Sequence, residues 1–87
     1  MRREPEFLGE DEGVLVHIAG KLREALAVEQ LLTTSGVDYV VETDHYYGGF
    51  IFQTTRVGAF FYVREDAAGL TRQLLADHGY RPKLGRR

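Results

Sequence analysis

The chain contains no cysteine, one serine (Ser35) and two prolines in 87 residues. The absence of cysteine excludes a disulfide-stapled scaffold and a thiol nucleophile. No long apolar stretch follows Arg2 and Arg3, and the longest apolar strings, 14–18 and 59–63, are far shorter than the roughly 20 residues that cross a bilayer. We therefore expect a cytoplasmic protein that has no membrane-spanning segment.

A large excess of charge of either sign is also missing, because 11 basic and 13 acidic residues give a net charge of -2. This balance provides no general attraction to nucleic acid or to an anionic membrane. The charges are segregated, however, since residues 1–12 are net acidic and residues 81–87 are strongly basic. We predict an acidic flexible N-terminal arm at 1–12, a single α+β domain at 13–80 and a basic C-terminal tail at 81–87. That tail is either simply solvated or docks on RNA or an acidic partner.

Two segments have the period of a helix that buries one face. In the first, apolar residues recur at three- and four-residue steps from Leu22 to Leu32. Ser35-Gly36-Val37 then supplies a glycine for the left-handed turn that ends a helix and an apolar residue to pack back on it. The second helix is predicted with Asp66 as its N-cap, and His78-Gly79-Tyr80 closes it in the same way.

Other segments have the composition or the alternation of β-strands. Residues 13–19 form a short β-branched run between two glycines, and residues 37–43 alternate between two faces. Residues 46–49 contain paired glycines and predict a turn. Residues 50–55 and 59–64 are interpreted as two strands, or equally as one long bulged strand.

The resulting order, β-α-β-β-(β)-α, places both helices on one face of a mainly antiparallel sheet. The expected fold is a ferredoxin-like α+β sandwich. About 65 to 70 folded residues lie near the lower size limit for a core that is stable alone. A partner subunit is therefore plausible on size grounds.

Chemistry-bearing residues are few. The three histidines lie on separate predicted elements without the i, i+4 spacing of a zinc site, so we predict no metal site. Ser35 lies where a helix ends, and Gly20-Lys21 departs from the phosphate-binding loop pattern in spacing and in its lack of a hydroxyl residue. Acidic residues are numerous, but their spacing selects no catalytic pair. We predict no catalytic residue and no cofactor, and the composition favours a non-enzymatic protein.

Aromatic residues are concentrated between positions 46 and 62. If Phe61 faces the helices, strand alternation directs Phe60 and Tyr62 to the opposite face. The same alternation places Leu15 and His17 together on that face. The predicted open sheet face carries the following apolar residues: Leu15, Val40, Ile51, Phe60 and Tyr62.

This open face is too apolar to be left exposed comfortably. We expect it to be buried in a homodimer or against a partner domain, the alternative being that a tail or loop of the same chain folds over it. Stacking of nucleic-acid bases is disfavoured, because only Arg56 and Arg64 lie nearby.

A resemblance to a known family lies in residues 22–32 (LREALAVEQLL), 35–39 (SGVDY), 61–67 (FYVREDA) and 73–75 (QLL). These segments resemble the prokaryotic signal-transducing protein domain family, which consists of small bacterial domains. The likeness covers about residues 14–79. It implies a ferredoxin-like fold and a regulatory or ligand-sensing role without established chemistry.

That family is similar in shape to the nitrogen-regulatory signalling proteins, in which the loop after the second strand carries a modifiable tyrosine. Tyr46 and Tyr47 occupy the corresponding turn here, but the turn is far shorter than such a loop. We therefore do not infer tyrosine modification or nucleotide binding for this chain from the resemblance.

The sequence thus favours a non-enzymatic regulatory or interaction module that acts as a homodimer. The alternative is a small-molecule-binding or enzymatic α+β dimer with a pocket at the open sheet face. The residues that would line such a pocket are His17, His45, Tyr46, Tyr47 and Tyr62.

Overall fold

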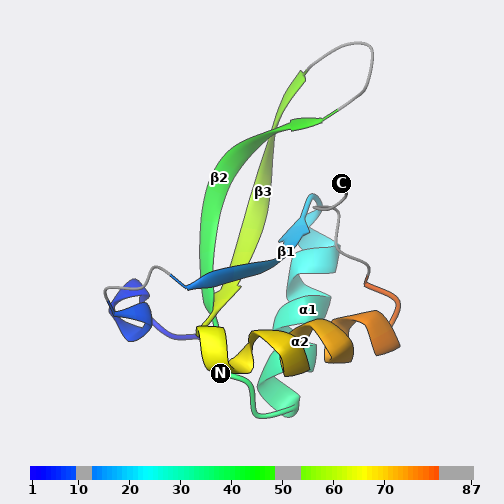
Figure 1. The fold of residues 1–87 in the computed structure, drawn as a ribbon. Helices are drawn as coiled ribbons and strands as arrows, with labels where there is room; N and C mark the ends of the chain where they lie inside the picture. Colours follow the sequence, from blue (N-terminus) through cyan, green and yellow to red (C-terminus); the bar gives the residue numbers. More distant parts are fainter. Residues whose placement is uncertain (10–12, 49–53, 81–87) are drawn as a thin grey trace.

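The computed structural model describes residues 1–9, 13–48 and 54–80, and for residues 45–48 and 54–56 it describes the backbone alone. The elements follow in the order η1 (Pro5–Leu8), β1 (Val14–Ala19), α1 (Leu22–Thr34), β2 (Val40–Gly48), β3 (Thr54–Val63) and α2 (Glu65–Asp77). The three strands form one antiparallel sheet in the order β1-β3-β2 (Figure 1). The α+β class and the antiparallel sheet with two helices are thereby confirmed.

The sheet is uneven in length. β2 pairs with β3 from Val40↔Tyr62 to Gly48↔Thr54, whereas β1 pairs only with the half of β3 that ends at Val63. The far end of the β2–β3 pair therefore extends beyond β1 and both helices (Figure 1). Of the two interpretations of the third strand region, the single long strand is correct from Thr54 onward, while residues 50–53 lie outside the described part.

The core lies between the sheet and the two helices. Phe61 and Val63 are fully buried at its centre, as are Val28 and Leu32 from α1, and Leu75 of α2 is almost completely buried. Phe61 and Val63 are two positions apart in β3 and therefore share a face. The predicted direction of Phe61 toward the helices is correct.

Both helices end as the sequence predicts. Gly36 has a φ of 78° and Gly79 a φ of 87°, in the left-handed region that glycine adopts at little cost. The amide of Val37 donates to the Leu32 carbonyl at 2.9 Å, and that of Tyr80 donates to the Leu75 carbonyl at 2.8 Å. These bonds are the Schellman pattern, in which the chain folds back on the last helical turn.

Some predicted boundaries are wrong. Asp66 is not the N-cap of α2, because β3 runs directly into the helix, Arg64 holds the cap position and no side chain caps it. Asp66 lies instead in the first turn, where its charge suits the helix dipole. The prediction of a turn that begins at Tyr46 is also wrong, since Tyr46 to Gly48 continue the pairing of β2 with β3; position 49 lies outside the described residues. Paired glycines permit a turn without forcing one, and the ladder bonds favour extension.

The N-terminal segment is attached to the domain over the residues that the structure describes. Arg2 forms a parallel bridge with Tyr39, and the amide of Arg3 donates to the Tyr39 carbonyl at 2.7 Å. η1 follows and contacts β2. Residues 1–9 therefore differ from the solvent-borne arm that composition suggests, because their backbone finds hydrogen-bonding groups at the beginning of β2.

Candidate functional site

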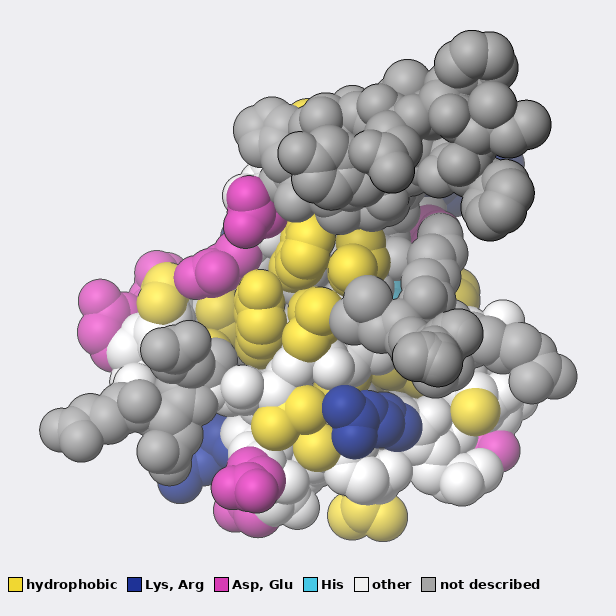
Figure 2. Space-filling view, turned by 45° about the horizontal axis from the view of Figure 1, so that its top comes forward, with side chains coloured by type: hydrophobic (Ala, Val, Ile, Leu, Met, Phe, Trp, Pro, Cys, Tyr) yellow, Lys and Arg dark blue, Asp and Glu magenta, His cyan; other side chains and the backbone are white. Residues whose placement is uncertain are grey.

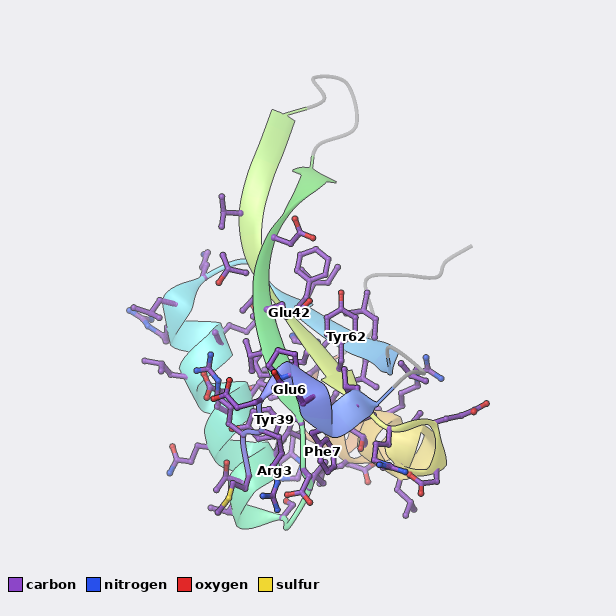
Figure 3. All side chains as sticks on the ribbon, turned by 90° about the vertical axis from the view of Figure 1, so that its left-hand side faces the viewer. Arg3, Glu6, Phe7, Tyr39, Glu42 and Tyr62 are labelled. Atoms are coloured by element: carbon purple, nitrogen blue, oxygen red, sulfur yellow. The ribbon has the colours of Figure 1, made fainter. Side chains whose placement is uncertain are left out.

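The sheet face opposite the helices carries two rows of side chains. Leu15, Tyr62 and Val40 pair across the three strands, and the neighbouring row contains Ile18, Phe60 and Glu42. Glu42 and Tyr62 lie on the side of the sheet away from α1 in Figure 3. Figure 2 shows hydrophobic side chains grouped below the far end of the hairpin, with acidic side chains along one border.

Burial on this open sheet face is unequal. Val40 is completely buried within the chain, and Ile18 and Phe60 are 6% and 9% exposed, whereas Leu15 and Tyr62 are half-buried. The shared face of Leu15, Val40, Phe60 and Tyr62 agrees with strand alternation. Ile51, the fifth residue predicted for this face, lies outside the described residues. The apolar surface still in contact with solvent is therefore centred on Leu15 and Tyr62.

His17 does not lie on the open sheet face, contrary to the prediction from alternation. The register of β1 against β3 shifts between Leu15 and His17, which is the signature of a β-bulge. The extra residue reverses the alternation, so that His17 turns toward the helices and Ile18 takes its place on the open face. A pocket that combines His17 with Tyr62 is consequently not formed.

The bulge places His17 in a closed environment. Its side chain is 2% exposed, and its Nε2 lies 2.6 Å from Oε2 of Glu24 in the first turn of α1. The rings of Phe61 and Tyr80 lie 6.3 and 5.6 Å away, measured between centroids. The second ring nitrogen, Nδ1, is buried and has no hydrogen-bond partner among the described residues. His17 therefore joins β1 to α1.

The other residues predicted to bind a ligand lie in β2. The backbone of His45, Tyr46 and Tyr47 pairs with Val57, Arg56 and Thr55 of β3. The structure does not describe the side chains of these three residues. Within the part of the chain that the structure describes, no three His, Asp or Glu side chains gather as a metal-ion site would require.

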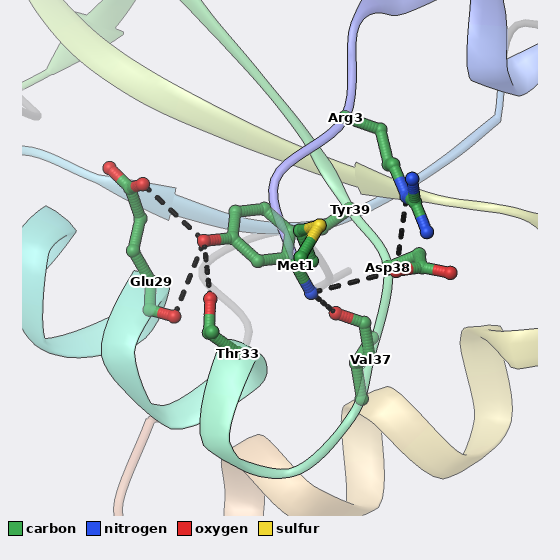
Figure 4. A network of polar contacts seen from close by, with 7 residues as sticks. All are labelled: Met1, Arg3, Glu29, Thr33, Val37, Asp38 and Tyr39. Carbon is green, nitrogen blue, oxygen red and sulfur yellow. Dashed lines mark hydrogen bonds and ion pairs between the residues drawn. The ribbon is translucent and has the colours of Figure 1, made fainter.

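A polar network joins the N-terminal segment to the end of α1 (Figure 4). The Tyr39 hydroxyl lies 3.0 Å from the hydroxyl of Thr33 and 3.3 Å from the carbonyl oxygen of Glu29. Burial raises the pKa of Tyr39, and the neighbouring Glu29 carboxylate raises it further. Sequence reasoning placed Tyr39 only as a strand residue, because these partners are six and ten positions away.

The same network includes a charged cluster. The guanidinium Nε of Arg3 lies 3.2 Å from the Asp38 carboxylate, and the amino group of Met1 donates to the Val37 carbonyl. The hydrogen bond from Arg3 holds the pKa of Asp38 below its usual value. This cluster fixes the N-terminal segment beside the turn between α1 and β2.

A cavity of about 530 Å³ opens next to this cluster, between η1, the end of α1 and the beginning of α2. Phe7 of η1 forms one wall, and guanidinium groups of Arg3 and Arg64 each lie 5.6 Å from the centre of its ring. Arg3 and Phe7 are labelled in Figure 3. Sequence reasoning missed this cavity, since its lining comes from three segments that only the fold brings together.

Comparison with known proteins gives no relative: no family model, no curated protein and no solved structure matches the chain. No helix in the described part is long and apolar enough to cross a membrane.

Proposed function

We propose that this protein is a non-enzymatic interaction module that associates with a second copy of itself through the open sheet face. The observation that carries the proposal is the apolar pair Leu15 and Tyr62, which stays partly exposed beside buried Val40 and Phe60. Exposed apolar patches on small proteins commonly mark interfaces, and tyrosine is enriched at such surfaces.

The size of the domain supports the same proposal. A chain of 87 residues buries a smaller share of its surface on folding than a larger domain does. A second copy packed on the open sheet face buries more apolar area without enlarging the core. The exposed Glu42 borders the patch and provides the polar rim that such interfaces have.

The proposed role is regulatory and cytoplasmic, and the fold is proposed to be a ferredoxin-like sandwich. Support for the fold comes from β1 and β2, which run in the same direction with β3 between them and α1 connecting them. Support for the regulatory role comes from the resemblance to bacterial signal-transducing domains described above.

A ligand pocket at the open sheet face is less well supported. Of the five residues predicted to line such a pocket (His17, His45, Tyr46, Tyr47 and Tyr62), His17 and Tyr62 are separated onto opposite faces by the bulge in β1. The remaining apolar surface suits a dry protein contact better than a polar ligand.

Sedimentation equilibrium at micromolar concentration tests the proposal. We expect a mass of about twice 9.9 kDa for the native chain and the monomer mass for Tyr62→Lys, because the lysine places an unpaired charge in the interface. Leu70→Lys is the matched control, since Leu70 is 81% exposed and belongs to α2, not to the strands that form the open face; this variant should remain a dimer. A native chain that sediments as a monomer contradicts the proposal.

A further inference from the structure

Three of the five large hydrophobic residues that are exposed in the described part of the chain gather in one place. Leu22, Leu26 and Val57 are 75%, 56% and 54% exposed. Leu22 and Val57 line the same groove, and Leu26 lies one turn after Leu22 in α1. The three residues therefore form one apolar patch, the α1–β3 patch, to which the first half of α1 and the middle of β3 contribute.

The patch exists because the apolar stripe of α1 is wider than the face that the domain covers. The residues that this helix buries are Ala25, Val28 and Leu32. Leu22 and Leu26 belong to the same stripe and remain exposed. Val57 lies two positions beyond Ala59, the residue of β3 at which pairing with β1 ends. The chain thus leaves these three side chains for a contact with another molecule.

The groove in the patch has room for a side chain from outside. Its volume is about 160 Å³, and Leu22 and Val57 are its large apolar residues. The other uncharged residues that line it are small: Ala19, Gly20, Ala25, Thr43, Gly58 and Ala59. Because small residues lie between two exposed apolar ones, the groove can accept one large apolar side chain of a partner.

The charges beside the patch select the sign of the partner. Lys21 lines the groove, and no acidic residue is among the described residues that line it. Arg23 is next to Leu22 in α1, and neither cation forms an ion pair with another described residue. The carboxylate of Glu24 is already hydrogen-bonded to the buried histidine of β1. A complementary partner therefore carries carboxylates next to its apolar side chain.

The spacing of the leucines favours a helical partner. Leu22 and Leu26 are four positions apart, and such pairs form the ridges that fit between the side chains of a second helix. An amphipathic helix in an apolar groove is a common mode of peptide recognition. Residues 81–87 of the same chain are basic, so their charge does not suit this patch.

We propose that the α1–β3 patch binds an acidic amphipathic helix of a partner protein. One large apolar side chain of that helix enters the groove between Leu22 and Val57, and its flanking carboxylates lie beside Lys21 and Arg23. The inference does not depend on the open sheet face, because α1 packs on the opposite face of the sheet.

Two synthetic peptides of one design test the class of partner. Both have leucines at the i, i+3, i+4 and i+7 positions of an alanine-based helix, and the flanking positions are glutamate in one and lysine in the other. Each is titrated into the full ¹⁵N-labelled chain. We expect saturable amide shifts at residues 21–26 and 57–59 with the glutamate peptide, and an affinity about tenfold lower for the lysine peptide. The absence of saturable shifts, equal affinities, or shifts confined to the open sheet face overturns the proposal.

Substitutions of exposed leucines locate the contact. The double variant Leu22→Ser, Leu26→Ser should keep the fold, because both side chains are exposed, and should weaken binding of the glutamate peptide at least about tenfold. Leu70→Ser is the matched control, since it removes an exposed leucine from α2 and should leave the affinity unchanged. Equal affinities of the double variant and the native chain overturn the proposal.

A charge substitution tests the contact with the carboxylates. Lys21→Gln should weaken binding of the glutamate peptide about threefold, the size of an exposed ion pair, and high salt should remove the difference. Arg72→Gln removes the same charge from α2 and should leave the affinity unchanged. Equal affinities of the two variants contradict the assigned role of Lys21.

Two further measurements separate this partner from other occupants of the patch. In sedimentation equilibrium, the double leucine variant should have the same mass as the native chain, and a lower mass would assign the patch to a second copy. Vesicles of equal parts phosphatidylcholine and phosphatidylglycerol should retain the native chain no better than the double variant. Retention that requires the two leucines would assign the patch to a membrane surface, and either assignment overturns the proposal.

Discussion

Nε2 of His17 lies 2.6 Å from Oε2 of Glu24, so that a strand residue and a helix residue share one hydrogen bond that is largely shielded from solvent. Nδ1 of the same ring has no partner among the described residues. Within the described part of the chain, the Glu24 carboxylate is therefore the single hydrogen-bond partner of the His17 ring.

Glu24→Ala should lower the free energy of unfolding by about 1–3 kcal/mol, the cost of a buried polar group that loses its partner. Urea denaturation at neutral pH measures the effect. Gln30→Ala is the control, because Gln30 is exposed on the same helix and its substitution should change the free energy by less than about 0.5 kcal/mol. Equal effects of the two substitutions would show that the pair does not stabilise the fold.

The glycines at positions 36 and 69 predict opposite responses to alanine. Gly36 has a φ of 78°, where a side chain costs about 1–2 kcal/mol. Gly69 lies within α2, and an added Cβ meets nothing within 4 Å. Gly36→Ala should therefore destabilise the protein, and Gly69→Ala should stabilise it by about 0.5–1 kcal/mol. Chemical denaturation of both variants measures the difference, and changes of the same sign would refute this account.

Asp38 should make the stability of the folded protein depend on pH in the acidic range. Its pKa is lowered in the folded state from the usual 3.8, chiefly by the hydrogen bond from Arg3. A depressed folded pKa gives a contribution that is present above pH 3.8 and is lost as the pH falls through the folded pKa. Thermal unfolding measures the effect. As the pH is lowered through this range, the melting temperature of Asp38→Asn should fall less than that of the native chain. High salt should reduce the difference, because both partners are partly exposed to solvent.

Tyr39 should have the opposite dependence on pH. Burial raises its pKa above the usual 10.0, so its contribution is present below pH 10.0 and is lost as the pH rises through the folded pKa. Tyr39→Phe should remove this dependence and cost about 1 kcal/mol at neutral pH, through loss of the hydrogen bond with Thr33. Phenolate absorbance and urea denaturation are the measurements. An unchanged alkaline profile in Tyr39→Phe would assign the dependence to another group.

Tyr80→Phe is the matched control for Tyr39→Phe. Tyr80 is half-buried, and phenylalanine preserves both its ring contact with His17 and its packing against the core. Its substitution should therefore leave the free energy of unfolding at neutral pH nearly unchanged.

The elements that local sequence predicts best are the helix ends. Gly36 and Gly79 each precede an apolar residue that folds back on the last turn, and all participants lie within six positions of one another. The boundaries at the turn near residue 46 and at the beginning of α2 were predicted less well. They depend on pairing with β3, which local preference does not encode.

The face of each strand could be predicted where the alternation is regular. Val40, Phe60 and Tyr62 share a face for this reason, and Leu15 joins them through its pairing with Tyr62. His17 could not be placed correctly, because the bulge that turns it inward adds one residue relative to β3. No glycine or proline within β1 marks that position.

By itself, the sequence determined the α+β class, the two helices and their C-terminal ends, because these follow from periodicity and from contacts between near neighbours. Only the tertiary structure decided the direction of His17, its bond to Glu24, the attachment of the N-terminal segment at Tyr39 and the cavity beside η1. These features join segments that are distant in the chain. Their energies depend on register and packing, which no local pattern specifies.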